Sequence, residues 1–195
     1  MTEVDAPARS VRHDAICTAV FELLSEVGYD RMSMDAVAAR ARASKATIYR
    51  AWPTKPDMVI DAVTHHFGGT PQAPDTGSLR GDLLAIMNGA CRFASSSDGA
   101  VLAGLMSAST HHPELSRTLH RCVYEMKNPI HETIITRARE RGEVPSSVGP
   151  DLLHEVLHAL VLTRKLWDCE PFDDEYVVHV VDDVLIPVLC HRAGR

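Results

Sequence analysis

Two short helical patterns lie back to back in the segment from Ser33 to Lys55, SMDAVAARARASKATIYRAWPTK, and each begins at a serine. A serine at the start of a helix can accept a hydrogen bond from a free backbone N–H in the first turn. Only Ala41, Arg42 and Ala43 separate the two patterns, so the chain must turn tightly between them. The segment therefore predicts two short helices joined by a tight turn, a helix-turn-helix arrangement.

The same segment is locally basic within an acidic chain. Residues 40–55 include five Lys and Arg and no acid, a local charge of +5, whereas the whole chain of 195 residues has a formal net charge of −6. The second helix carries Thr47 and Tyr49, whose hydroxyls suit phosphate oxygens, and Lys45 can reach a guanine edge or a phosphate. These side chains favour a DNA-reading helix. The alternative, a basic surface for an acidic protein, predicts no steep salt dependence of DNA binding.

Composition narrows the class of protein. Hydrophobic residues make up 45% of the chain and charged residues 24%, as in globular proteins. No apolar run approaches the roughly 18 residues of a membrane span, and the N-terminus lacks an apolar signal core. We therefore expect a cytoplasmic protein with no membrane partner. The five cysteines are scattered and form no CxxC, which favours free thiols and gives no support to a zinc finger.

Apolar residues recur at helical spacing along the chain, and no run alternates as a strand would. The pattern predicts an all-α fold of about nine helices. Outside the Ser33–Lys55 segment, they are expected near residues 9–27, from 55 onward, and at 78–94, 98–109, 113–141, 150–167 and 173–190. Gly28 should end the first helix in a left-handed conformation. Pro129 and Pro187 should kink or break the helices that contain them.

Several side chains are expected to cap helices. The predicted N-caps are Ser33, Ser44, Thr54, Ser78 and Asp173.

The segment of residues 68–77, GGTPQAPDTG, is the clearest linker. It separates an N-terminal helix-turn-helix domain, residues 1–67, from a C-terminal domain, residues 78–195. The last two predicted helices each have an apolar face, which can be buried within one chain or against a second copy. Because a two-fold reader of successive major grooves needs two copies, we predict a homodimer through these helices.

These residues together resemble the DNA-binding domain of the TetR family of bacterial regulators. The resemblance covers roughly residues 9–67, and its most specific part is SKATIYRAWPTKPDMV, residues 44–59. It implies that Lys45 reads bases and that Trp52 takes an aromatic core position usually filled by Phe. Phosphate contacts are implied for Ser33, Thr47, Tyr49 and Lys55. The full predicted DNA-contacting set is Ser33, Ser44, Lys45, Thr47, Tyr49, Arg50 and Lys55.

Two residues depart from the family pattern. Arg42 stands in the turn where the family usually has glycine, which predicts a strained positive φ. Asp35 lies near the DNA-facing start of its helix, where many relatives carry a basic or neutral residue.

The resemblance implies that the C-terminal domain binds an effector and forms the dimer. We expect a sequence-specific, DNA-binding transcriptional regulator, a repressor that a small apolar effector releases from a double-stranded operator. No enzymatic activity, cofactor or metal is expected. The candidate effector-binding residues are apolar or polarisable: Met87, Cys91, Phe93, Leu105, Met106, Tyr124, Met126, Trp167 and Phe172.

A competing hypothesis comes from an HExxH sequence, His154-Glu155-Val156-Leu157-His158. Two histidines four residues apart share a helix face and can hold zinc, with the glutamate as a general base. The match is short, lies in a chain rich in histidine and has no obvious companion ligand. A zinc-binding helical protein or a zinc hydrolase is therefore kept as the alternative function.

Overall fold

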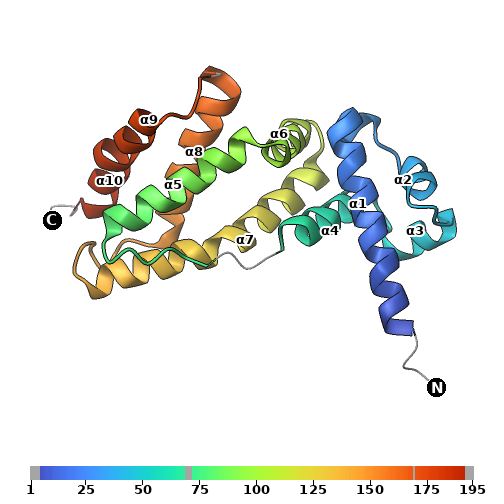
Figure 1. Cartoon of the computed structure of the whole chain (residues 1–195), viewed down its shortest axis with the longest axis horizontal. Coiled ribbons are helices and arrows are strands. Elements are labelled where there is room, and N and C mark those ends of the chain that lie inside the picture. Colours follow the sequence, from blue (N-terminus) through green and yellow to red (C-terminus); the bar gives the residue numbers. More distant parts are fainter. Residues whose placement is uncertain (1–4, 69–71, 169, 192–195) are drawn as a thin grey trace. The chain divides into compact units, whose positions relative to one another are not determined.

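The computed structural model describes residues 5–68, 72–168 and 170–191, with side chains from residue 11 onward (Figure 1). Every regular element in these ranges is a helix, which confirms the predicted all-α fold. The helices are α1 (Asp5–Arg31), α2 (Met34–Arg40), α3 (Lys45–Ala51), α4 (Lys55–Phe67), α5 (Leu79–Ser95), α6 (Ser97–Ser109), α7 (Pro113–Glu140), α8 (Pro150–Thr163), α9 (Asp174–His179) and α10 (Ile186–Cys190).

Two π-helical segments extend these helices. Arg164–Asp168 continues α8, and Val180–Leu185 joins α9 to α10, so the described chain forms nine continuous helical stretches. None of the helices in the described ranges is both long enough and apolar enough to cross a bilayer. The four described cysteines, which exclude Cys169, are free thiols.

The predicted N-caps are confirmed. Each accepts a hydrogen bond from a backbone N–H in the first turn of its helix: Ser33, Ser44, Thr54, Ser78 and Asp173. Because free N–H groups at a helix start otherwise need water or another acceptor, these side chains set where the helices begin.

Glycine and proline act differently within the helices. Gly28 has φ 75° and ψ 173°, so the helical backbone is interrupted at this residue and has the positive φ expected there. One further turn follows, and α1 ends at Arg31 instead of at Gly28. Pro129 lies inside α7, which continues to Glu140. Pro187 directly follows the π-helical segment, inside the continuous stretch that α9 and α10 form. Neither proline breaks its helix.

The described chain divides into two compact units. The first contains Met1–Gly69 and Ala100–Cys122, and the second contains Thr70–Gly99 and Val123–Arg195. Most of α6 and the start of α7 therefore cluster with the helix-turn-helix, whereas the sequence-based division places them in the C-terminal domain. The linker of residues 68–77 lies partly outside the described residues.

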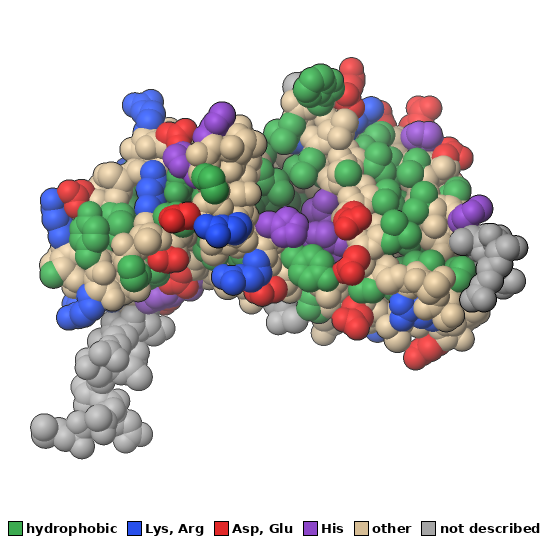
Figure 2. Space-filling view, turned by 180° about the vertical axis from the view of Figure 1, so that it is seen from behind, with side chains coloured by type: hydrophobic (Ala, Val, Ile, Leu, Met, Phe, Trp, Pro, Cys, Tyr) green, Lys and Arg blue, Asp and Glu red, His purple; other side chains and the backbone are tan. Residues whose placement is uncertain are grey.

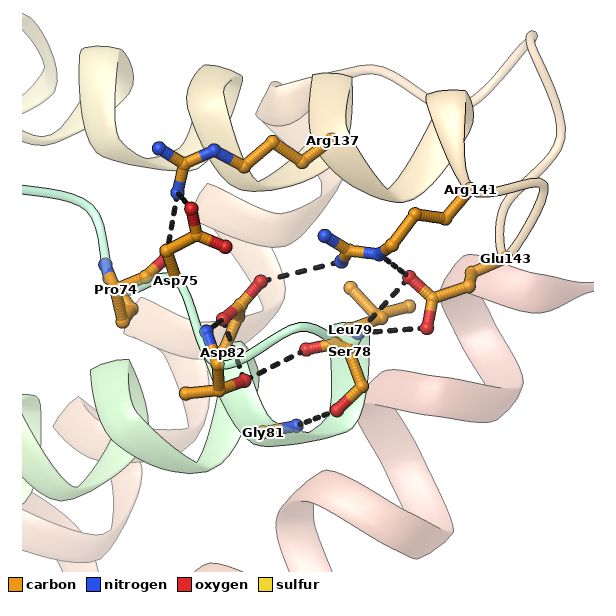
Figure 3. A network of polar contacts seen from close by, with 10 residues as sticks. Pro74, Asp75, Ser78, Leu79, Gly81, Asp82, Arg137, Arg141 and Glu143 are labelled. Carbon is orange, nitrogen blue, oxygen red and sulfur yellow. Dashed lines mark hydrogen bonds and ion pairs between the residues drawn. The ribbon is translucent and has the colours of Figure 1, made fainter.

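A polar network fastens the start of α5 to the end of α7 within the second unit (Figure 3). The carboxylate of Asp82 is fully buried, accepts hydrogen bonds from the Thr76 N–H and hydroxyl at 2.8 Å, and lies 3.4 Å from Arg141. The Glu143 carboxylate accepts from the Leu79 N–H at 3.0 Å. A buried carboxylate is stable only with such partners, so this network fixes the beginning of α5.

Most of the two apolar faces expected at the dimer interface lie in the core of the second unit. The residues buried there include Leu153, Leu157, Val161, Val177, Val180, Val181 and Leu185. Val178 and Val188 instead stay exposed, at 42% and 37%. Within one chain, one side of the last helices is thus buried in the core, and another side exposes apolar side chains to solvent.

Candidate DNA-binding surface and effector region

The orientation of α3 is set by what it buries. Ile48 is completely buried, and Trp52, which ends the helix, is also in the core of the first unit. Trp52 therefore takes the buried aromatic position that the resemblance implied. With that side inward, Lys45, Tyr49 and Arg50 are exposed on the outer side, and Tyr49 has 51% of its surface accessible.

The turn between α2 and α3 closes α2 with a left-handed residue. Arg42 has φ 51°, as its sequence position predicted. Its N–H donates to the Ala39 carbonyl and the Ala43 N–H donates to the Ala38 carbonyl, at 3.2 and 2.9 Å. These two bonds form a Schellman motif, which usually has glycine at the left-handed position.

The predicted phosphate-contacting hydroxyls also hold the helices. Ser33 accepts from the Ala36 N–H and Ser44 from the Thr47 N–H, both at 3.1 Å. The Ser44 and Thr47 hydroxyl oxygens are 2.8 Å apart. The two hydroxyls at the start of α3 thus lie together on the exposed edge of the helix-turn-helix.

Ion pairs neutralise two of the five cations in the basic segment. Lys45 Nζ lies 2.6 Å from the Asp35 carboxylate, which raises the lysine pKa through the hydrogen bond and the charge. Arg40 donates to both oxygens of Glu26 at 2.9 and 2.7 Å and lies 3.3 Å from Glu22. Its guanidinium is therefore committed to α1.

Lys55 is held by the end of α1. Its ammonium donates to the Tyr29 carbonyl at 2.5 Å and lies 4.1 Å from the centre of the Tyr29 ring. Partial burial lowers the lysine pKa. Arg42 and Arg50 form no ion pair within the described residues. These two exposed cations therefore remain available for an anionic ligand.

A polar cluster that sequence reasoning missed lies between α1 and α4. The Asp61 carboxylate oxygen Oδ2 accepts from Trp52 Nε1 and lies near His13 Nε2, both at 2.7 Å. The buried Cys17 sulfur lies 3.7 Å from His13 Nε2, and burial together with Asp61 raises the thiol pKa to about 12. The available signal was spacing: His13 and Cys17 are four residues apart, as are Asp61 and His65.

The candidate effector residues are distributed over both compact units. Met87 and Cys91 are buried in α5, and Phe172 packs against the same core. Trp167 is 86% exposed. Leu105 and Met106 belong to the first compact unit, which contains Ala100–Cys122, whereas Phe93, Tyr124 and Met126 are partly buried in the second.

Polar side chains gather between α7 and α8 in the second unit, and Figure 2 shows histidines grouped on the face that it presents. The rings of His154 and His158 are 4.2 Å apart, and His131 lies 5.4 and 5.9 Å from them. Burial lowers the pKa of His131 to about 3 and that of His158 to about 4. His131 is 4% exposed, and its Nδ1 has no hydrogen-bond partner in the described part of the chain.

This histidine group does not form a three-ligand metal site. Among the described residues, the sets whose ligand atoms all lie within 4.8 Å of one another involve His13 and its neighbours, and none includes His154 or His158. Glu155 is exposed. The HExxH hypothesis of a zinc hydrolase is therefore not favoured.

Comparison with known proteins gives matches to both halves of the chain. Residues 16–62 match the family described as "Bacterial regulatory proteins, tetR family", and residues 73–184 match "Tetracyclin repressor-like, C-terminal domain". The HTH-type transcriptional regulator Rv1556 of Mycobacterium tuberculosis is 34% identical over 185 residues, covering 95% of this chain and 91% of the relative. The DNA-binding transcriptional repressor TetR of Mycobacteroides abscessus is 35% identical, covering 91% and 94%.

Solved structures show the same fold. The TetR family transcription regulator SCO0332 superimposes with a TM-score of 0.71 and 28% identity, covering 90% of this chain and 97% of that one. FadR from Bacillus subtilis, solved in complex with stearoyl-CoA, has a TM-score of 0.63 at 18% identity, covering 90% and 96%.

Proposed function

The chain belongs to the TetR family of DNA-binding transcriptional regulators, and from this we propose that it is a dimeric repressor released from its operator by a small molecule. Residues 1–67 would form the DNA-binding domain, and residues 78–195 the effector-binding and dimerisation domain. Regulators of this family bind operators and small-molecule effectors, typically as dimers.

The observation that carries this proposal is the exposed side of α3. Ile48 and Trp52 anchor the opposite side, so Lys45, Tyr49 and Arg50 face outward from a braced helix. We assign base reading to Lys45. Contacts with the DNA phosphate backbone are assigned to Arg50 and to four hydroxyl groups, those of Ser33, Ser44, Thr47 and Tyr49. Lys55 would have to leave the Tyr29 carbonyl to bind a phosphate, so its first role is to brace α4 against α1.

For the effector we propose the second unit, between α5, α7 and α8. Lys127 is partly buried, lies 5.9 Å from the centre of the Phe93 ring and has no ion pair in the described part of the chain. Burial lowers its pKa. Met87 and Cys91 on α5 supply apolar surface, while Lys127 and His131 supply hydrogen-bond donors. This combination suits a mainly apolar molecule that carries one polar or anionic group.

The DNA-binding proposal can be tested with genomic fragments. Selection of bound fragments should enrich a near-palindromic site, to which fluorescence anisotropy then measures affinity. Arg50→Ala should weaken DNA binding about three- to tenfold. The slope of log affinity against log salt concentration should become shallower by about one, as expected for a lost phosphate contact. Arg92→Ala, which removes an exposed arginine of α5, is the matched control.

The proposal fails if no sequence is enriched and if Arg50→Ala and Tyr49→Ala both bind DNA as the unaltered protein does. The effector assignment has a separate test. Native mass spectrometry of protein purified from its own host should show a copurified small molecule, and its loss from a Lys127→Met variant would locate it.

A further inference from the structure

We propose that His13, Cys17 and Asp61 form a binding site for a divalent transition-metal ion of the zinc class, directly behind the reading helix. The three residues come from two packed helices, α1 and α4, and their ligand atoms all lie within 4.8 Å of one another. Imidazole nitrogen, thiolate sulfur and carboxylate oxygen are the ligand types that zinc and cobalt accept.

The donor atoms lie near the separations of tetrahedral coordination and reach them by small side-chain movements. With ordinary zinc bond lengths, a tetrahedral ion separates a sulfur from a nitrogen ligand by about 3.6 Å and a nitrogen from an oxygen ligand by about 3.4 Å. Cys17 Sγ lies 3.7 Å from both ring nitrogens of His13, so the imidazole must turn before Nε2 and the sulfur can share one ion. His13 Nε2 and Asp61 Oδ2 are 2.7 Å apart, as a hydrogen-bonded pair, and would have to separate by about 0.7 Å to bind one ion together. The fourth position would be left for water.

The surroundings of the site favour a cation. Asp61 and Asp14 contact His13, and Asp14 also lies 2.9 Å from His65, yet neither carboxylate is paired with a lysine or an arginine in the described residues. Cys17 is buried, while His13 and Asp61 are partly exposed, so an ion can enter from solvent. The thiol thus lies beside two carboxylates whose charged neighbours, within the described residues, are histidines alone.

Proton movements balance on this arrangement. Binding releases the thiol proton of Cys17 to solvent. The proton that His13 Nε2 donates to Asp61 is exchanged through solvent to Nδ1, so the neutral imidazole keeps one proton and Nε2 can bind the ion. Nδ1 lies 4.0 Å from Asp14 Oδ1, which becomes the acceptor that orients the ring. Histidines that bind metals usually donate their other N–H to such a carboxylate.

The site connects to the DNA-reading helix through one shared atom. Asp61 Oδ2 also accepts from Trp52 Nε1, and Trp52 ends α3. An ion bound to Asp61 therefore changes the contact that holds the end of the reading helix. We infer that metal binding alters the affinity of the protein for DNA.

The test uses cobalt as a spectroscopic substitute for zinc and protein without a histidine tag. Titration should produce a cobalt–thiolate charge-transfer band that saturates at one ion per chain and disappears when zinc is added. Cys17→Ser should abolish the band, and Asp61→Asn, which keeps an acceptor for Trp52, should weaken binding at least about tenfold. Cys190→Ser, in the second unit, is the matched control and should leave the titration unchanged.

A second readout separates a lost site from a lost fold. In a Trp167→Phe background, Trp52 is the remaining tryptophan, and zinc should change its fluorescence in the parent but not in Cys17→Ser. Circular dichroism melts establish that each variant is folded. Three outcomes would overturn the proposal. The band could be absent with cobalt in large excess, it could persist in folded Cys17→Ser, or it could be lost in His158→Gln. None of these outcomes bears on whether the protein binds an operator.

Discussion

Arg42 and Asp35 show how single side chains modify the helix-turn-helix. Arg42 occupies the left-handed position of the Schellman motif, where its Cβ is strained. Asp35 pairs with Lys45 and thereby neutralises the side chain to which we assign base reading. Both residues reduce what the motif could otherwise achieve, the first in stability and the second in attraction for DNA.

Replacing Arg42 with glycine should therefore stabilise the protein. Glycine removes the strain at φ 51° but increases the freedom of the unfolded chain, so the net gain should be about 0.5–1 kcal/mol. Urea unfolding without DNA measures it. Arg50→Gly, within α3, should instead destabilise by about 1 kcal/mol. A lower free energy of unfolding for Arg42→Gly would show that the arginine makes compensating contacts.

Replacing Asp35 with asparagine should strengthen DNA binding. The change frees the Lys45 ammonium and removes a negative charge from the reading face. Affinity for a short duplex at low salt should rise about three- to tenfold, with a salt slope steeper by about one. Glu175→Gln, an equal change of charge on α9, should have little effect. Unchanged affinity for Asp35→Asn would mean that Lys45 does not approach the DNA.

Among the helices, the short α2 and α3 depend most on their supports. Each has seven residues, too few to be stable alone in water. Stability comes instead from their serine caps, the Schellman turn and the buried side chains of Ile48 and Trp52.

The longer helices α7 and α8 enclose a group of histidines whose charged forms the fold disfavours.

That histidine group predicts acid sensitivity. His131 and His158 have pKa values of about 3 and about 4 in the folded chain, below the ordinary 6.5. Between these values and 6.5 the unfolded chain binds protons that the folded chain does not, so stability falls as the pH is lowered. From pH 7 to pH 5 the free energy of unfolding should drop by about 2 kcal/mol for each imidazole, or about 4 kcal/mol for the pair.

Urea unfolding at several pH values checks this. His131→Gln should flatten the dependence, because glutamine does not titrate, whereas His120→Gln, at an exposed position, should leave it unchanged. An identical pH dependence in the parent and in His131→Gln would show that acidic residues, not these imidazoles, cause the loss.

For the whole molecule, the proposed dimer depends on a surface through which two copies can associate. Each proposed half-site reader needs a second reader held at a fixed distance, and the exposed apolar side chains of the last helices offer the surface for that contact. Val178 and Val188 are exposed although most of their helix is buried in the core. They are therefore the positions where association can be disrupted without emptying the core.

Introducing charge there should produce monomers. Val178→Glu combined with Val188→Glu should roughly halve the mass measured by light scattering after size-exclusion chromatography. Operator affinity should fall by more than about tenfold, because a single reader loses the contribution of its linked second copy. Val11→Glu, an exposed valine of α1, is the control. A dimeric double variant would place the interface elsewhere.

The sequence by itself determined the helices and their ends. Ser33, Ser44 and Thr54 cap as predicted, and Gly28 and Arg42 have the expected positive φ, because these features depend on residues within one turn of each other. The reading helix and its exposed side chains followed from the same local rules. Which positive charges of the basic segment stay unpaired did not follow from them.

Only the tertiary structure decided which charges remain free. Lys55 meets the carbonyl of Tyr29, and Arg40 meets glutamates of α1, so the local charge of +5 overstates what DNA can encounter. His13 and Asp61, 48 residues apart, are brought together in the same way. Such contacts depend on how helices pack, and packing places side chains from distant positions within ångströms of one another. A pattern read along the chain can locate a helix, but it cannot say which side chains its neighbours will neutralise.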